Sequence, residues 1–299
     1  MPYGSESFEV VLSPPHNPSM PLTMEELALY ERKLQRVAKR QQTYLRQKTA
    51  ADLRDALKRK ELILYFEPVI CTRTMKTMGA NMVLKIKRQG FGLIPTQHIL
   101  ARVEGSVILI ELGCWMITQI LRQISKSPQD FVFTMKVSPY QLRDHKFTSC
   151  IINLLGQNKD GHGHLALMLT DEELAQQGNE LDGVLRMLTS AGITFSLSHT
   201  DDVERTTRLL KSGFFSTLAL DGRMIEAAEQ DEQKDLAFKR LIKKAHSCQC
   251  KLKVVGVDSA EQVARCRDLG IDEVKGSVIA PAVPLAALQS RVRLNKGQV

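Results

Sequence analysis

The feature that most limits how this chain can fold is an alternation between short apolar runs and longer amphipathic stretches. The apolar runs are rich in β-branched and aromatic residues and are bounded by turn residues, which is typical of buried strands. We expect strands over residues 131–137, 164–170, 193–199, 215–221, 251–257 and 272–276. Helical patterns separate them, over residues 139–156, 172–191, 203–212, 222–247 and 259–270. Such alternation over about 250 residues favours a (β/α)8 barrel or a doubly wound parallel sheet.

Two adjoining strands precede this alternation, in the segment ELILYFEPVICTRTMKTMGANMVLKIKR at residues 61–88. In the first strand, side chains alternate in character, and we expect Pro68 to end it. A polar turn leads into the second strand, over residues 78–87, and a helical pattern over residues 95–125 follows. The sequence therefore predicts eight strands, the number that a closed (β/α)8 barrel contains.

The N-terminal segment, residues 1–22, is rich in Pro, Ser, Gly and Asn without periodicity and is predicted to be a disordered arm. Thr23 and Glu26 have the spacing of a capping box, and a helical pattern runs over residues 23–48. Its apolar positions recur at alternating intervals of three and four, as in a short heptad seam. The seam consists of Leu27, Tyr30, Leu34, Val37, Gln41 and Tyr44.

Two interpretations of this seam stay open, because so few heptads do not decide between them. The seam packs on the chain's own barrel, or the helix is a dimerising or signal-coupling segment. A second helical stretch, residues 48–60, leads directly into the first strand. Our hypothesis is that residues 23–60 mediate self-association or partner docking.

The chain is basic, with a net charge of +8 and a pI near 9.2. Such a charge is compatible with binding to nucleic acid, but only 5% of the residues are aromatic, which weakens a single-strand stacking surface. We keep a nucleic-acid-associated regulator as an alternative, and a solvated basic face as its plain counterpart. The basic residues of the N-terminal helix are Lys33, Arg36, Lys39, Arg40, Arg46 and Lys48.

Cysteine usage and hydropathy indicate a cytoplasmic protein. The six cysteines lack the spacing of a disulfide framework, and the N-terminus lacks the layout of a secretory signal, so we expect reduced thiols. No apolar run approaches the roughly 20 residues that span a bilayer, so no membrane span is expected.

Several segments together resemble one family. The opening ELILYFEPVI…GANMVLKI is similar to ELxLYYQPIV…GAEALLRW, the start of the EAL domain, a cyclic-di-GMP phosphodiesterase barrel. Further along, VSPYQL, STLALDGRMI and VVGVDSAEQ resemble VSARQL, DTLKIDRSFV and AEGVETxEQ, and LGIDEVKGSVIAPAVP resembles LGxDxxQGYLFxxPxP. These landmarks occur in the same order along nearly all of residues 50–292. The resemblance implies a TIM-like (β/α)8 barrel of the EAL type over residues 49–292, with an N-terminal helical extension and a tail at 293–299.

The family reaction is hydrolysis of a phosphodiester by metal-activated water at the C-terminal ends of the strands. It needs carboxylate and amide oxygens around two hard cations. In this sequence Asn81 stands at the glutamate of the Glu-Ala-Leu signature, and Lys136 stands at a ligand asparagine. Met168 stands at a second glutamate, and Ser198 and His199 stand at paired aspartates.

The remaining family positions are altered in the same way. Ala219 stands at a lysine, Val255 at a glutamate, and Lys275 at a glutamine, while Asp258 stands at the second glutamate of its motif. Asp221 is kept as a strand-scaffolding residue, and the phosphate-contacting arginine position is Lys85. These eleven residues form the predicted vestigial pocket.

Because Met168 and Val255 offer no oxygen and Lys136 brings a positive charge, we expect no phosphodiesterase activity, no metal and no other cofactor. The resemblance then implies a regulator acting through protein–protein contacts in bacterial cyclic-di-GMP-related, motility or biofilm signalling. The partner's identity is not predicted, and a homodimer is one form of it. A non-hydrolysing cyclic-di-GMP sensor using Lys85, Lys136 and Lys275 is kept as an alternative.

Overall fold

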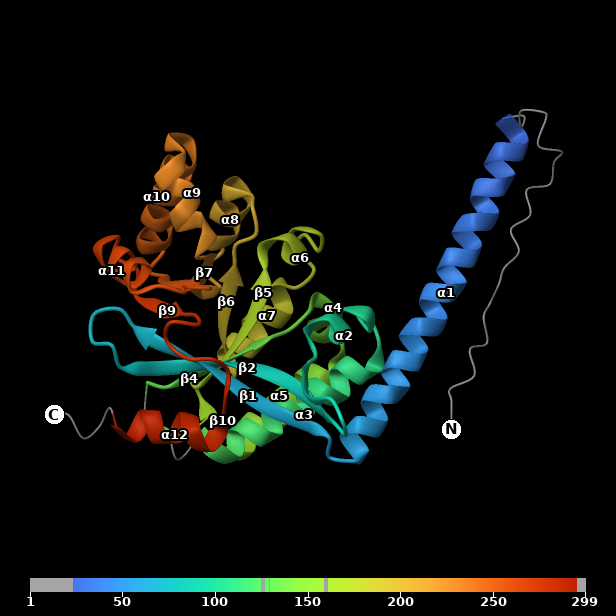
Figure 1. Cartoon of the computed structure of the whole chain (residues 1–299), viewed down its shortest axis with the longest axis horizontal. Helices are drawn as coiled ribbons and strands as arrows, with labels where there is room; N and C mark the ends of the chain where they lie inside the picture. Colours follow the sequence, from blue (N-terminus) through green and yellow to red (C-terminus); the bar gives the residue numbers. More distant parts are fainter. Residues whose placement is uncertain (1–23, 125–126, 129, 159–160, 295–299) are drawn as a thin grey trace. The chain divides into compact units, whose positions relative to one another are not determined.

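A computed structural model of the chain describes residues 24–124, 127–128, 130–158 and 161–294 (Figure 1). The predicted arm at 1–22, the Thr23 cap and the last five residues of the predicted tail lie outside these ranges. The chain divides into two compact units, Met1–Thr49 and Ala50–Val299. None of the helices in the described ranges is both long and apolar enough to cross a membrane.

One helix, α1 (Met24–Lys58), replaces the two consecutive helical stretches that the sequence predicts. No glycine or proline interrupts residues 24–58, so nothing in the backbone chemistry ends the helix at residue 48. Of the predicted seam, Leu34 and Val37 are half-buried and Tyr44 is exposed. The side chains of Leu27 and Tyr30 lie outside the description.

Within the second unit, the last turns of α1 belong to the hydrophobic core. Leu53 and Ala56 are buried there. Arg54 makes a bidentate contact with Glu111, with nitrogen–oxygen distances of 2.9 and 3.1 Å.

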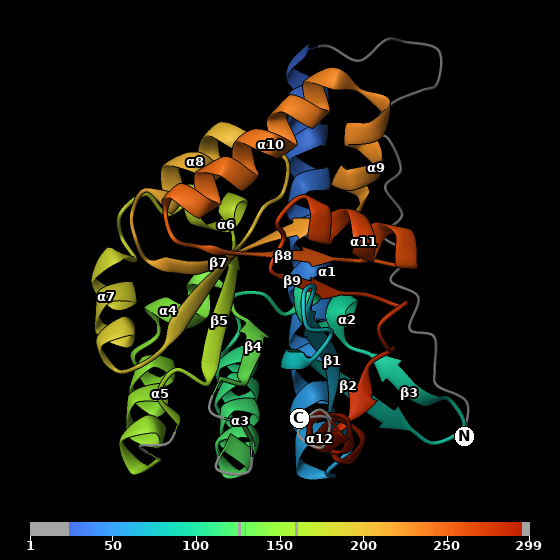
Figure 2. The same ribbon diagram turned by 90° about the vertical axis from the view of Figure 1, so that its left-hand side faces the viewer.

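Eight strands close into a barrel, which confirms the predicted fold class (Figures 1 and 2). Seven of them run parallel, and β1 is antiparallel to both of its neighbours, β2 and β9. The β1–β9 pairing therefore closes the ring. The barrel strands are β1 (Leu62–Cys71), β2 (Thr77–Arg88), β4 (Val132–Lys136), β5 (Leu165–Thr170), β6 (Thr194–Ser198), β7 (Phe215–Asp221), β8 (Lys251–Val255) and β9 (Glu273–Lys275).

The expectation that Pro68 ends the first strand is wrong, because β1 continues to Cys71 and Pro68 pairs with Ala80 of β2. On its other side, β1 pairs with β10 (Val283–Pro284) at residues 65–66 and with β9 at residues 70–71. Pro68 falls between these two pairings, where a missing N–H is tolerated.

The predicted helix over residues 95–125 is three elements. Strand β3 (Gly92–Pro95) pairs with β2, and α2 (Gln97–Arg102) is separated from α3 (Val107–Ile124) by a turn in which Gly105 has a φ of 73°. Glycine adopts this left-handed conformation without steric cost, so it separates the two helices.

Three other predicted helices are also split, two are shortened, and one helix in the described part of the chain was not predicted. Asp144 and Asp231 each cap a second helix inside a predicted single one, by accepting hydrogen bonds from backbone N–H groups. The resulting helices are α4 (Pro139–Arg143), α5 (His145–Gln157), α6 (Asp171–Ala175), α7 (Asp182–Ser190), α8 (Val203–Leu210), α9 (Arg223–Gln230), α10 (Glu232–Ser247) and α11 (Ala260–Asp268), and the unpredicted α12 (Leu285–Leu294) follows β10.

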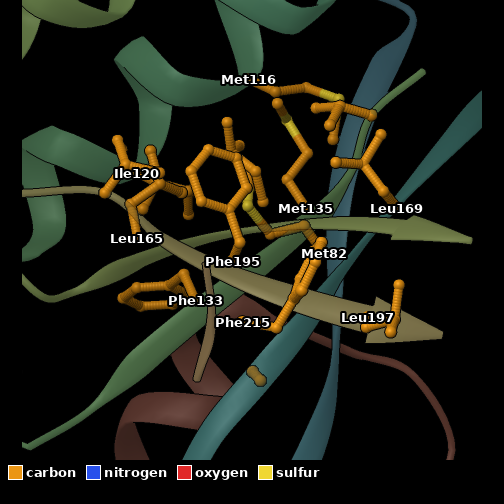
Figure 3. Packing of buried hydrophobic residues seen from close by; sticks show 14 of the residues in the cluster. Met82, Met116, Ile120, Phe133, Met135, Leu165, Leu169, Phe195, Leu197 and Phe215 are labelled. Carbon is orange, nitrogen blue, oxygen red and sulfur yellow. The ribbon is translucent and has the colours of Figure 1, made fainter. Parts of the chain in front are cut away.

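The main core lies between the strands and the surrounding helices. Side chains along each barrel strand alternate between this layer and the barrel interior. Figure 3 shows Phe195 and Leu165 from the strands packed with Met116 and Ile120 of α3, with Met135 close by. The residues between these positions face the interior, and those nearest the C-terminal strand ends build the site described next.

Candidate functional site

Most of the predicted pocket residues lie within the last three positions of the parallel strands, and the strand register brings several of them side by side. Lys136 of β4 pairs with Met168 of β5. Ser198 of β6 pairs with Ala219 of β7. Asp221 of β7, Val255 of β8 and Lys275 of β9 form one further row around the barrel.

Lys136 is exposed, and it forms an ion pair with Glu173, whose Oε1 lies 3.6 Å from the lysine Nζ. The other carboxylate oxygen of Glu173 accepts a hydrogen bond from the backbone N–H of Thr170 in a capping box that starts α6. The same carboxylate therefore fixes a helix start and neutralises the lysine. Met168, beside Lys136, contributes only a thioether.

Asn81 is buried, with 7% of its surface exposed, and pairs in register with Glu67 of β1. Its Oδ1 has no hydrogen-bond partner among the described residues. The predicted signature position is therefore an amide in the barrel interior rather than a carboxylate that could bind a cation.

Glu67 forms an ion pair with Lys275 across the β1–β9 seam that closes the barrel. Both side chains are mostly buried, with 33% of Glu67 and 17% of Lys275 exposed. The motifs that these two segments resemble carry glutamine at both positions. Glu67 and Lys275, two side chains of opposite charge, therefore stand where the motifs carry two neutral glutamines.

A second ion pair lies deeper in the barrel. Lys253 is between Leu252 and Val254, which face the helix layer, so its own side chain points into the interior. Its Nζ lies 3.4 Å from Oε2 of Glu273, and only 7% of the lysine side chain is exposed. Burial lowers the pKa of Lys253, and the carboxylate of Glu273 partly offsets that effect.

The other predicted residues are held by different partners. The Nζ of Lys85 lies 4.1 Å from the centre of the Tyr65 ring, a cation–π contact. Asp221 accepts hydrogen bonds from the guanidinium of Arg223 at 2.7 and 2.9 Å, and this contact lowers the pKa of Asp221. Asp258 is exposed beyond the end of β8.

His199 is not directed at the row of strand ends but is buried against Asp171, the first residue of α6. Its Nδ1 lies 2.6 Å from Oγ1 of Thr206 and 3.3 Å from Oδ2 of Asp171. Asp171 also accepts hydrogen bonds from the hydroxyl groups of Thr206, at 2.5 Å, and Thr200, at 2.7 Å. These bonds tie the loop after β6 to the start of α6.

The side chain of Asp171 is fully buried, and burial alone would raise its pKa. The hydrogen bonds from His199, Thr206 and Thr200 outweigh burial, so the pKa of Asp171 is lowered. The carboxylate is therefore charged at neutral pH, with Arg205 Nε 3.6 Å from Oδ2.

Sequence reasoning did not select Glu67, Lys253, Glu273, Asp171 or Glu173. The sequence features that could have identified three of them are their positions within or next to the predicted strands. Lys253 and Glu273 stand at alternate positions of short strands, where interior-facing residues fall, and Asp171 follows a strand directly. Their pairing could not be deduced, because it depends on the barrel register. Among the described residues, no three His, Cys, Asp or Glu side chains are grouped as metal ligands.

Comparison with known proteins gives a consistent result. Residues 50–282 match the EAL domain family. The chain is 20% identical over 245 residues to the bifunctional diguanylate cyclase/cyclic di-GMP phosphodiesterase MucR of Pseudomonas aeruginosa, covering 81% of this chain and 36% of MucR. It is 23% identical over 256 residues to the uncharacterized protein Rv1357c of Mycobacterium tuberculosis, covering 82% and 83% of the two chains.

Among solved structures, the PaMucR phosphodiesterase in complex with c-di-GMP superposes with a TM-score of 0.71 at 20% identity, over 81% of this chain and 99% of that one. At this identity the superposition supports the fold. The chain spans about a third of the length of the first curated relatives that it matches.

Proposed function

This chain belongs to the EAL domain family, and on that premise we propose that it is a non-catalytic member that acts as a regulator through protein–protein contacts in cyclic-di-GMP-related signalling. The observation that carries the proposal is the chemistry of the strand ends. Where hydrolysis needs oxygen ligands, Lys136 and Met168 stand side by side. Mg²⁺ and Mn²⁺ are bound by oxygen-rich ligand sets, which an ammonium and a thioether do not supply.

The donor set around these two residues does not fit a divalent cation either. Val255 and Ala219 are apolar, and Asp221 is held by Arg223. Asn81 adds one neutral amide oxygen. A cation at this place would have to displace ion pairs rather than complete an open coordination shell.

The charges at the barrel mouth also count against a sensor that binds cyclic-di-GMP without cleaving it. Each of the lysines that could hold its phosphates has an internal partner: Lys85 has Tyr65, Lys136 has Glu173, and Lys275 has Glu67. Binding a dianionic ligand would require breaking these contacts, and the displaced carboxylates would repel the phosphates.

The protein–protein contacts that we propose are made by α1. The part of α1 in the first unit exposes basic side chains and carries half-buried Leu34 and Val37 on the seam. We expect this segment to mediate self-association or docking of a partner. Sedimentation velocity of the full chain, a Leu34→Asp/Val37→Asp variant and a 49–299 truncation tests it.

The expected result is a higher oligomer, or a stable partner complex, that the full chain forms and both altered chains lose. Equal monomeric behaviour of all three chains, together with recovery of the same partners, would exclude the role of α1. Release of linear product from cyclic-di-GMP in the presence of Mn²⁺ would exclude the non-catalytic assignment itself.

A further inference from the structure

Helices α3 and α5 lie side by side on the outside of the barrel (Figures 1 and 2). Their approach is close because α3 carries Gly113 at the contact. A Cβ atom at this position would lie 2.5 Å from Cε2 of Phe147 and 2.9 Å from Nε2 of Gln141. The same amide of Gln141 donates a hydrogen bond of 2.9 Å to the carbonyl of Leu109. The glycine therefore seats the Phe147 ring directly on the backbone of α3.

This approach brings two cysteines together. Cys114 follows Gly113 on α3, and Cys150 lies one helical turn after Phe147 on α5. Both thiols are partly exposed, and their side chains interact with each other. Burial, followed by this interaction with Cys150, raises the pKa of Cys114.

The other thiols differ from this pair. Cys71 is partly exposed but lies at the end of strand β1 rather than on a helix. Cys248 and Cys250 are close in sequence, but Cys250 is buried and its Sγ donates a hydrogen bond of 2.7 Å to the carbonyl of Phe215. Cys266 is buried in the core, where burial raises its pKa to about 11. Two partly exposed thiols on two neighbouring helices are therefore a distinct feature of Cys114 and Cys150.

We propose that Cys114 and Cys150 form a redox-modification site, at which a low-molecular-weight disulfide oxidant joins α3 to α5 through a protein disulfide. In the first step the Cys150 thiolate attacks one sulfur of glutathione disulfide, forms a mixed disulfide and releases one glutathione thiolate. The Cys114 thiolate then attacks Sγ of Cys150 and displaces the second glutathione. Two protein thiols and one glutathione disulfide become one protein disulfide and two glutathione thiols.

The order of the two steps follows from the surroundings. Thiolate is the attacking species, and the raised pKa of Cys114 keeps its thiolate fraction small. Cys150 is therefore the first thiol to react, and Cys114 resolves the mixed disulfide, helped by its fixed proximity. The site lies on the outer helix layer and does not depend on the proposed function of the strand ends.

The test is incubation of the full-length protein in glutathione buffers of increasing oxidising poise, followed by acid quenching, alkylation and peptide mapping by mass spectrometry. The wild type and Cys248→Ser are expected to yield a linked Cys114–Cys150 peptide. Cys114→Ser should instead accumulate glutathione on Cys150, because the resolving thiol is missing. Cys150→Ser should leave Cys114 largely unmodified at the same poise.

The proposal is overturned if the linked peptide is absent at a poise that fully oxidises an exposed dithiol peptide in the same tube. Equal formation of a Cys248–Cys250 link would also overturn it, because the oxidation would then not be specific. If Cys114→Ser does not fold, as judged by circular dichroism, Cys114→Ala replaces it. The comparison of the wild type with Cys150→Ser is sufficient by itself.

Discussion

Lys275, the last residue of β9, forms an ion pair with Glu67 of β1, which lies 208 positions earlier in the chain. The contact spans the seam where the barrel closes. It also occupies the barrel mouth with two charges that neutralise each other.

Removing one member of this pair should cost more than removing both. Glu67→Gln leaves the largely buried ammonium of Lys275 without its carboxylate, whereas Glu67→Gln/Lys275→Gln leaves two neutral amides. A double-mutant cycle of urea unfolding should give a coupling free energy of about 1–3 kcal/mol. Arg143→Gln and Glu180→Gln, which break an exposed pair, are the control and should give less than about 1 kcal/mol. Equal coupling in the two cycles would contradict the account.

The deeper pair of Lys253 and Glu273 should matter to stability throughout the neutral range. Lys253→Met leaves the Glu273 carboxylate unpaired and should lower the free energy of unfolding by about 3 kcal/mol. The control is Lys251→Met on the exposed end of the same strand, with an expected change within about 0.5 kcal/mol. Similar losses in both variants would show that the interior charge plays no special role.

Lys253 also predicts a dependence of stability on pH. Its pKa is lower in the folded protein than the ordinary value of 10.5, so the unfolded chain binds more protons between these two values. Its contribution to the free energy of unfolding should therefore increase as the pH rises through that window. In Lys253→Met this part of the increase should be missing. A rise of the same size in both proteins, measured by urea unfolding, would exclude Lys253 as its source.

Asp171 should stabilise the loop after β6 in its charged form. Its pKa is lowered from the ordinary 3.8, so the stabilisation is present above that value and is lost as the pH falls below it. Asp171→Asn should cost about 3 kcal/mol at pH 7, and the difference from wild type should shrink on acidification. Asp201→Asn, on the exposed carboxylate that pairs with Arg205, should cost less than about 1 kcal/mol. A pH-independent loss in Asp171→Asn would contradict the assignment.

Gly276, directly after the Lys275 position, should tolerate no side chain. A Cβ atom there would lie 1.8 Å from the carbonyl oxygen of Val257, so Gly276→Ala must displace backbone at the barrel mouth. We expect a loss of several kcal/mol, on the order of the largest single-residue effects. Gly156→Ala, at an open helical position of α5, should be neutral or stabilising by about 0.5–1 kcal/mol. Thermal unfolding of both variants checks the contrast.

The strands of the barrel could be predicted from the sequence, because strand periodicity and turn residues are local properties. The choice of a barrel over a doubly wound sheet came from the resemblance to the EAL domain. The eight barrel strands are confirmed. The effects of single residues on element boundaries were harder to predict. Pro68 does not end β1, because it falls between the pairings of β1 with β10 and with β9. Asp144 caps a new helix inside a predicted single helix. These outcomes depend on tertiary pairing and on cap geometry, which periodicity does not encode.

In the candidate site, too, some features follow from the sequence and others depend on tertiary pairing. The positions of Lys136 and Met168 at neighbouring strand ends follow from strand order alone, and the structure places them in register. The pairing of Lys275 with Glu67 required knowledge of which strand closes the barrel. That His199 points away from the barrel mouth could not be predicted, because its contact with Asp171 forms only when the loop after β6 is folded.

The most direct test of the account is calorimetric titration of cyclic-di-GMP into the full-length protein, with and without Mn²⁺, combined with product analysis. We predict no binding heat at tens of micromolar protein and no linear product, because Lys136 and Met168 lie at neighbouring strand ends and Lys136 and Lys275 are paired with Glu173 and Glu67. Metal-independent binding would instead support the sensor and make Lys136 the first residue to change. Metal-dependent binding or hydrolysis would contradict the central claim.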